Sequence, residues 1–169
     1  MPMTPRHPER YDYQRNGTRN LFMFSEPLRG FRHVEVTNRR TARDFAQQMK
    51  WLVDDAYPQA KVIRVVLDNL NTHRIASLYK AFEPAEARRI ARRLEFHYTP
   101  KHGSWLNMAE IEFSVLGRVC LNRRIPDERT LKREIAALES ERNQAKATVN
   151  WQFTSRDARS KLNDIYPHN

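Results

Sequence analysis

A short apolar run near the middle of the chain constrains the fold most. Residues 61–69 read KVIRVVLDN, so β-branched side chains and a leucine lead directly to an acidic residue. Residues with helical spacing precede and follow this run. A strand that is apolar on both faces and lies between helices is typical of the centre of a parallel or mixed sheet. The sequence therefore predicts an α/β domain in which this run is a buried central strand.

Two β-rich segments nearer the start of the chain predict a hairpin. They cover residues 20–28 and 31–39, and only Arg29 and Gly30 separate them. A short connection that contains glycine allows two such segments to pair as antiparallel neighbours. We therefore expect one antiparallel strand pair before the central strand.

The other predicted elements alternate along the rest of the chain. They are a helix from the N-cap Thr41 to Tyr57, helical segments over 74–94 broken at Pro84, a strand over 94–100, and helices over 103–123, over 127–146 and from about residue 155. Residues 1–18 are rich in Pro, Arg and Tyr without periodicity and are interpreted as an N-terminal arm. Residues 19–169 are interpreted as one α/β domain.

The charge of the chain favours a polyanionic partner. Its 169 residues contain 30 Lys and Arg against 20 Asp and Glu, a formal net charge of +10. Nucleic acid is the common partner of such a chain, although many basic proteins bind none specifically. The single cysteine, Cys120, fits a reducing compartment. No apolar run has the length of a membrane span and no signal-like core is present, so we expect a cytoplasmic protein without a membrane partner.

Asp68 is the first candidate site residue. It stands where the central strand ends, and open α/β sheets place their ligands at the carboxyl ends of their strands. Asn71 and His73 follow in a polar, turn-prone segment. The alternative is that Asp68 caps the helical segment from residue 74, and on this segment alone that alternative is the stronger one.

The helix over 103–123 carries the second candidate. On a helical wheel, one stripe faces the core; its members are Leu106, Ala109, Phe113, Leu116 and Cys120. Glu110 lies off that stripe on a small, polar face, whereas Glu112 either borders the core or reaches past it. Taken alone, both could be ordinary solvated glutamates. Together with Asp68 at a strand end in a very basic chain, Glu110 instead indicates phosphoryl transfer with two metal ions, which several carboxylates must hold.

Three blocks of the sequence resemble a known family. They are YQRNGTRNLFMF, VVLDNLNTH and HYTPKHGSWLNMAEIEFSVL. In this order they resemble the DDE transposases of the mariner-like superfamily, in the branch of bacterial insertion sequences, over nearly the whole chain. The last block is the most specific, because W-L-N-x-x-E follows T-P-x-H. The resemblance implies an RNase H-like fold, a mixed sheet flanked by helices, and metal-dependent cleavage and joining of DNA at transposon ends.

The resemblance also assigns roles to residues. Asp68 matches the second catalytic acid, and Glu110, three residues after Asn107, matches the third; both would bind Mg²⁺ or Mn²⁺ in a two-metal site. Supporting or DNA-facing roles are implied for six residues, namely Asn71, His73, Lys101, His102, Trp105 and Asn107. The implied partners are transposon ends and target DNA, with a homodimer for synapsis of two ends. The implied location is the nucleoid of a bacterial cytoplasm.

The chain departs from the family pattern in two ways. Glu110 follows Asp68 by 42 residues, which is longer than the commonest spacing and fits an enlarged helical crossover. The first catalytic acid is missing, and neither Asp12 nor Glu35 matches its position. The domain is therefore expected to lack the first, mid-sheet strand, to leave two hydrophobic strand edges unpaired, and to be inactive alone without an amino-terminal partner fragment. The alternatives are a basic DNA-binding fragment and an inactive remnant.

Overall fold

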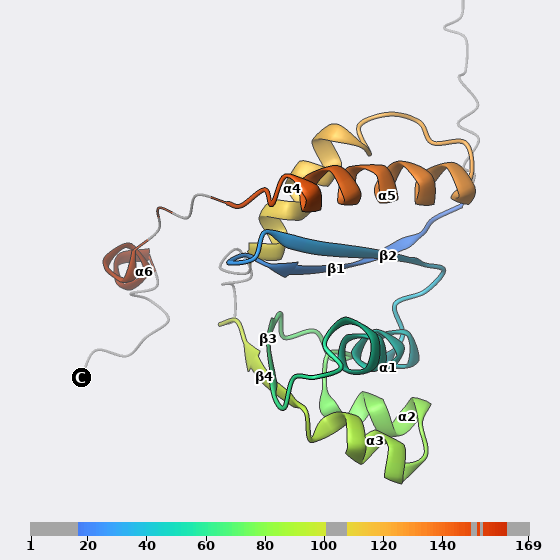
Figure 1. Ribbon diagram of the computed structural model, residues 1–169, viewed down its shortest axis with the longest axis vertical. Coiled ribbons are helices and arrows are strands. Elements are labelled where there is room, and N and C mark those ends of the chain that lie inside the picture. The colour runs from blue at the N-terminus through green and yellow to red at the C-terminus, as the bar shows by residue number, and fades with distance from the viewer. Residues whose placement is uncertain (1–16, 101–107, 150–151, 153, 162–169) are drawn as a thin grey trace, which may run out of the picture.

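The chain folds into helices on both sides of a β-hairpin, with a second strand pair beside it (Figure 1). The computed structural model describes residues 17–100, 108–149, 152 and 154–161. Strands β1 (Asn20–Glu26) and β2 (Phe31–Thr37) pair antiparallel, and β3 (Ile63–Leu67) and β4 (Leu94–Tyr98) pair parallel. The expected mixed α/β class is confirmed.

The β1–β2 hairpin forms where it was expected. Phe22 and Phe24 of β1 face one side of the sheet, and Leu21 and Met23 face the other. Gly30 closes the turn with a φ of +63°, a conformation that residues with a side chain rarely adopt. A Cβ atom at this position would lie 2.5 Å from the backbone oxygen of Lys146, so glycine also permits a close backbone contact.

Helix α1 (Ala42–Trp51) begins at the predicted N-cap. The Thr41 hydroxyl accepts a hydrogen bond from the Asp44 amide at 3.3 Å, and the Asp44 carboxylate accepts one from the Thr41 amide at 2.7 Å. This reciprocal capping box satisfies two amides that the first helical turn leaves unpaired. The helix continues as a π-helical turn, η1 (Leu52–Ala56), and ends before Tyr57.

The segment between β3 and β4 is helical and broken at proline, as predicted. It contains a 3₁₀ turn, η2 (Ile75–Ser77), followed by α2 (Leu78–Ala81) and α3 (Pro84–Ala91). Pro84 stands at the first position of α3, where its missing N–H is not needed. This crossover places β4 beside β3 in the same direction.

The prediction that residues 61–69 form a strand buried on both faces is wrong for the described residues. Strand β3 pairs with β4 alone, and the two strand pairs are separate sheets. Ile63, Val65 and Leu67 face the core, whereas Val62 and Val66 are 53% and 58% exposed. The cause is tertiary, because no described helix covers the outer face of β3. Within the described residues, the β1–β2 and β3–β4 pairs share no hydrogen bonds.

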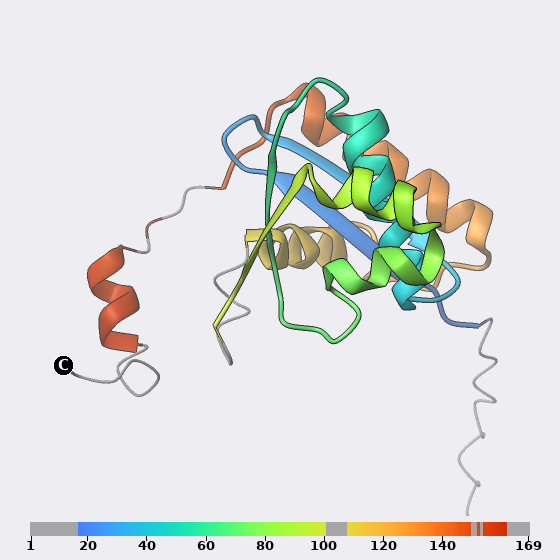
Figure 2. The ribbon, with the colours of Figure 1, turned by 90° about the horizontal axis from the view of Figure 1, so that it is seen from below.

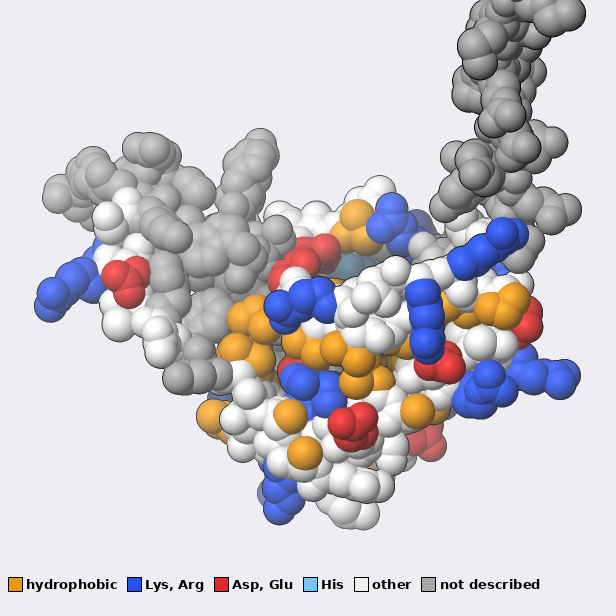
Figure 3. All heavy atoms as spheres, turned by 90° about the horizontal axis from the view of Figure 1, so that it is seen from above, with side chains coloured by type: hydrophobic (Ala, Val, Ile, Leu, Met, Phe, Trp, Pro, Cys, Tyr) orange, Lys and Arg blue, Asp and Glu red, His pale blue; other side chains and the backbone are white. Residues whose placement is uncertain are grey.

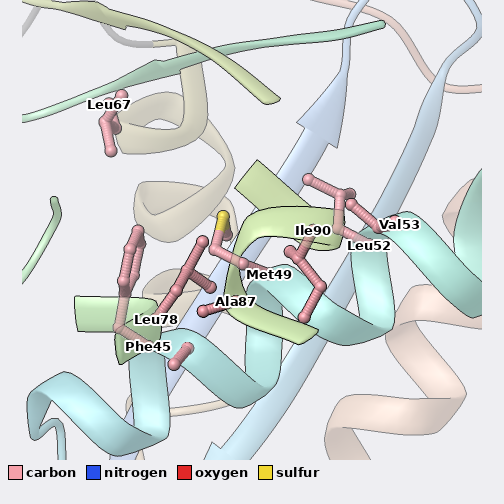
Figure 4. Close-up of a cluster of buried hydrophobic side chains, with 9 residues drawn as sticks. Phe45, Met49, Leu52, Val53, Leu67, Leu78, Ala87 and Ile90 are labelled. Atoms are coloured by element: carbon pink, nitrogen blue, oxygen red, sulfur yellow. The ribbon is translucent and has the colours of Figure 1, made fainter. Parts of the chain in front are cut away.

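Two hydrophobic cores lie on opposite faces of the hairpin. The first core packs helices α1, α2 and α3 and the turn η1 against the inner face of β3 and β4. Figure 4 shows its members Phe45, Met49, Leu52, Val53, Leu67, Leu78, Ala87 and Ile90. Phe22 and Phe24 pack against this core although their sheet is not hydrogen-bonded to β3. The second core lies between the hairpin and helices α4 and α5, and it includes Val34, Val36, Leu116, Cys120 and Ile135.

The carboxy-terminal helices differ from expectation mainly in their ends. Helix α4 is described over Met108–Val119, so it ends four residues before the predicted Arg123, and its predicted start lies outside the described residues. Helix α5 (Glu128–Gln144) begins at the N-cap Asp127. Helix α6 (Ser155–Lys161) lies away from both cores in Figures 1 and 2. No helix within the described ranges is long and apolar enough to cross a membrane.

Candidate functional site

Asp68 lies where the parallel strand β3 ends. Its side chain is 43% exposed, and its Oδ1 lies 2.6 Å from Nδ1 of His73. The alternative that Asp68 caps the next helix is wrong, because Arg74 stands at the N-cap of η2 and no side chain caps that turn. The carboxylate is therefore available to solvent and oriented by a histidine.

His73 is itself held in place by two aromatic residues. Its ring stacks on Phe45 with centroids 4.7 Å apart, and its backbone oxygen accepts a hydrogen bond from the Tyr98 hydroxyl at 2.8 Å. Tyr98 was missed at the sequence level. Parallel pairing of the two strands would have identified Tyr98, because it places Tyr98 at the end of β4 directly beside Leu67 at the end of β3. These contacts fix the ring that contacts Asp68.

The turn between Asp68 and His73 is tightly built. The His73 amide donates to the backbone oxygen of Leu70 at 2.9 Å, and the Ser77 hydroxyl donates to the backbone oxygen of Thr72 at 2.6 Å. Asn71, the other predicted support for Asp68, lies exposed in this turn.

Glu110 lies exposed in the first described turn of α4. Ser114 on the same face is also exposed, and a Cβ atom built at Gly117 would meet nothing within 4 Å. The opposite face carries the buried Leu116 and Cys120. The helical wheel therefore correctly separated the core-facing stripe from the open face that carries Glu110.

Glu112 does not belong to the open face. It is 3% exposed and forms ion pairs with Arg32 of β2 and Arg142 of α5. The interpretation of Glu112 as a solvated glutamate is thus wrong, and its border position at the core is correct. The two partners are remote in sequence, so no local pattern indicates this pairing.

The two candidate carboxylates lie on different elements of the fold. Asp68 directly follows β3, and Glu110 lies in the first described turn of α4. Carboxylate oxygens of this kind suit hard divalent ions such as Mg²⁺. Within the described ranges, however, no three His, Cys, Asp or Glu side chains form a group that could hold a metal ion.

Four predicted site residues lie outside the described residues. These are Lys101, His102, Trp105 and Asn107. Their proposed roles at the DNA-facing side therefore remain predictions.

Basic side chains on the α4–α5 face are dispersed. Figure 3 shows separate Lys and Arg side chains on this face, with hydrophobic and acidic side chains between them. A surface of this kind can attract a polyanion over a distance, because attraction to the phosphate backbone depends on summed charge. The described side chains visible in this view form no continuous basic band of the sort that follows a DNA backbone.

Comparison with known proteins shows the family. A family model described as DDE superfamily endonuclease matches residues 4–132, which is more than half of the chain and includes both candidate carboxylates. The chain therefore belongs to the DDE superfamily endonucleases. The mixed α/β architecture, with small sheets flanked by helices, is consistent with an RNase H-like DDE domain. No curated protein and no solved structure matches the chain.

Proposed function

We propose that this chain is the catalytic domain of a transposase of the mariner-like superfamily, in the branch of bacterial insertion sequences. Its reaction is metal-dependent cleavage and joining of DNA strands at the ends of the element. The family match establishes a DDE endonuclease domain, and the finer assignment rests on the blocks VVLDNLNTH and TPKHGSWLNMAE. We assign residues 19–169 to this domain and residues 1–18 to an arm.

The observation that carries the proposal is the position of Asp68. A carboxylate at the carboxyl end of a parallel strand lies where α/β sheets bind ligands, and the 2.6 Å contact with His73 orients it. We assign Asp68 as the second catalytic acid and Glu110 as the third. His73 acts as a positioning residue, and Asn71, Lys101, His102, Trp105 and Asn107 support the site or face DNA.

Mg²⁺ or Mn²⁺ is the proposed cofactor, with Asp68 and Glu110 as its protein ligands. The oxygen donors suit these ions, but two carboxylates are fewer than a two-metal site requires. The metal ions would stabilise the attacking and leaving oxygens of the phosphodiester. The chain's own contribution is to hold two carboxylates on separate elements, one of them oriented by His73.

We further propose that the active domain contains one more strand and one more acid than the described residues supply. The break between the β1–β2 and β3–β4 sheets supports this, because one hydrophobic core spans two sheets that share no hydrogen bonds. A strand inserted there, carrying the first acid, would join the sheets and complete the carboxylate set. It would come from an amino-terminal segment or partner fragment outside these residues.

DNA is the proposed partner of the basic chain, and synapsis of two transposon ends is the proposed reason for a homodimer in the bacterial nucleoid. The alternative is a fragment that binds DNA without cutting it. The net charge of +10 and the small number of site carboxylates favour this alternative for the chain alone. It predicts salt-sensitive DNA affinity and no nicking on addition of Mn²⁺.

Titration with Mn²⁺ tests the assignment of the two acids. Asp68→Ala and Glu110→Ala should each weaken Mn²⁺ binding, measured by calorimetry, because each removes a ligand. Asp55→Ala is the matched control, since Asp55 is an exposed carboxylate on η1. Equal Mn²⁺ affinity in all four proteins, the parent chain included, would contradict the proposed site.

A further inference from the structure

A buried carboxylate lies on the helix that carries Glu110. The Oε2 atom of Glu112 lies 3.0 Å from Nε of Arg32, although this contact lacks hydrogen-bond geometry. The Oε1 atom accepts hydrogen bonds from Nη2 of Arg142 at 3.0 Å and from Nη2 of Arg32 at 3.4 Å. One carboxylate thus connects β2, α4 and α5.

Arg32 has little freedom to follow Glu112 if α4 turns. Its amide donates to Oδ1 of Asn143 at 2.8 Å, and its backbone oxygen accepts from Nδ2 of the same residue at 2.7 Å. Its guanidinium also donates to Oδ1 of Asn143 at 3.3 Å and to the backbone oxygen of Ala147. The partner of Glu112 is therefore anchored at both its backbone and its side chain.

Such a network determines orientation more strictly than apolar packing does. Leu116 and Cys120 hold α4 against the hairpin, but apolar contacts are non-directional and tolerate small rotations of a helix. A buried carboxylate that loses its cationic partners is strongly disfavoured, so only a narrow range of rotations keeps Glu112 paired.

The rotation of α4 also determines where Glu110 points. Successive residues of an α-helix are about 100° apart, so Glu110 and Glu112 lie about 200° apart, on nearly opposite sides of α4. This relation holds in the structure, where Glu112 is buried and Glu110 is exposed. Fixing one side chain against the hairpin therefore fixes the other towards solvent.

We propose that Arg32, Glu112 and Arg142 are positioning residues that set the rotation of α4 and so determine the direction in which the Glu110 side chain points into solvent. The proposal rests on the proposed function for the role of Glu110, but not for the rotation itself. The proposal assigns these three residues no contact with substrate or metal. They act on the reaction only through the direction of the Glu110 side chain.

The rotation is tested by a distance between two spin labels. In a Cys120→Ala background, labels at Asn71→Cys and Glu110→Cys sit at two exposed positions, one after β3 and one on α4. Glu112→Gln should shift or broaden the measured distance distribution, because it removes the charge that both arginines pair with. Leu116→Ala is the control, since it removes a buried apolar side chain from the same face of α4.

An unchanged distribution in a folded Glu112→Gln protein, or an equal change in Leu116→Ala, would overturn the proposal. If Glu112→Gln does not fold by circular dichroism, Arg142→Gln replaces it. The Arg142 side chain is 22% exposed at the rim of the network, and its loss leaves the Arg32–Glu112 pair intact. Compared with Arg142→Gln, Arg142→Lys should bring the distance distribution part of the way back to that of the parent protein, because lysine keeps the positive charge but lacks the planar guanidinium group.

A second measurement separates this proposal from the proposed function. With native residues at 71 and 110, Glu112→Gln should weaken Mn²⁺ binding by about tenfold or more, the range for residues that orient a metal ligand. If Asp68→Ala leaves Mn²⁺ binding unchanged, the metal site is wrong while the distance result still decides the rotation. If Asp68→Ala weakens binding and Glu112→Gln does not, the positioning role is wrong and the metal site stands.

Discussion

The two strand pairs of this protein, with seven residues per strand in one and five in the other, differ most in their surroundings. The β1–β2 hairpin has a hydrophobic core on each face. The core built on α1, α2 and α3 covers one face, and α4 and α5 cover the other. The β3–β4 pair packs one face only and leaves Val62 and Val66 exposed. Strand β3 is thus more apolar than β1 and yet is covered on fewer faces. What surrounds a strand, rather than its own composition, decides how much of it is buried.

The edges of the two pairs differ as well. Along the outer edge of β2, Glu139 of α5 accepts a hydrogen bond from the Val34 amide at 2.9 Å, and Asn143 pairs with both backbone groups of Arg32. Side chains therefore take the place of a neighbouring strand at this edge. Strand β3 pairs with β4 alone within the described sheets. Polar groups left at such an edge favour pairing with another strand.

The largest expected effect tests the coverage of β3. Leu67→Ala should lower the free energy of unfolding by about 2–5 kcal/mol, because Leu67 is buried in the first core. Val66→Ala, the neighbouring residue on the outer face, should change it by less than about 1 kcal/mol, since Val66 is 58% exposed. Urea unfolding of both variants measures the difference. Losses of equal size would mean that both faces of β3 are covered in solution.

The next effect tests the closed edge of β2. Asn143→Ala should destabilise the fold by about 1–3 kcal/mol, because the backbone groups of Arg32 lose their partner in a partly buried position. Amide exchange at Arg32 should accelerate. Gln144→Ala, one residue further along α5, is the control, because among the described residues its side chain bonds to Ser140 within the same helix. If exchange at Arg32 stays slow in Asn143→Ala, water or another group closes this edge.

The smallest effect concerns an exposed ion-pair network between α1, η1 and α3. Arg89 lies 2.7 Å from Glu86 and 2.8 Å from Asp54, and Lys50 joins both carboxylates. Hydrogen bonds from Arg89 first and Lys50 second lower the pKa of Glu86 from 4.5 to about 2, and the same two partners lower the pKa of Asp54.

Because the folded pKa is the lower one, the unfolded chain takes up protons first as the pH falls. The stabilisation is therefore complete above about pH 4.5 and is lost as the pH falls towards 2. Arg89→Ala should lower stability by less than about 1 kcal/mol at neutral pH, since the network is partly exposed, and should flatten the acid limb of the stability curve. Arg88→Ala, an exposed neighbour, should leave that limb unchanged. Identical acid limbs would show that the network contributes nothing.

Local patterns predicted the elements of the fold well. Thr41 marked the start of α1, Gly30 marked the hairpin turn, and Pro84 marked the start of α3. Each of these depends on hydrogen bonds or dihedral angles within a few residues, so neighbouring sequence is sufficient. The exposed face of β3 was not predictable in this way, because it depends on whether a distant helix covers the strand.

In the candidate site, too, the features that depend on neighbouring residues were predictable and those that depend on distant residues were not. The position of Asp68 after β3 followed from the end of the apolar run, and the exposure of Glu110 on α4 followed from helical periodicity. The burial of Glu112 did not, since its partner Arg32 lies 80 residues earlier and Arg142 lies 30 residues later. The contact between Tyr98 and His73 required knowledge that β3 and β4 pair in parallel.

The contact between Gly30 and the backbone of Lys146 has one further consequence. At its turn, the hairpin packs against the backbone just after the carboxyl end of α5. Along β2, the side chains of Glu139 and Asn143 occupy the edge of the strand. An additional strand therefore cannot pair with β2 unless α5 moves away. The hairpin sheet can grow in one direction only, outward from β1.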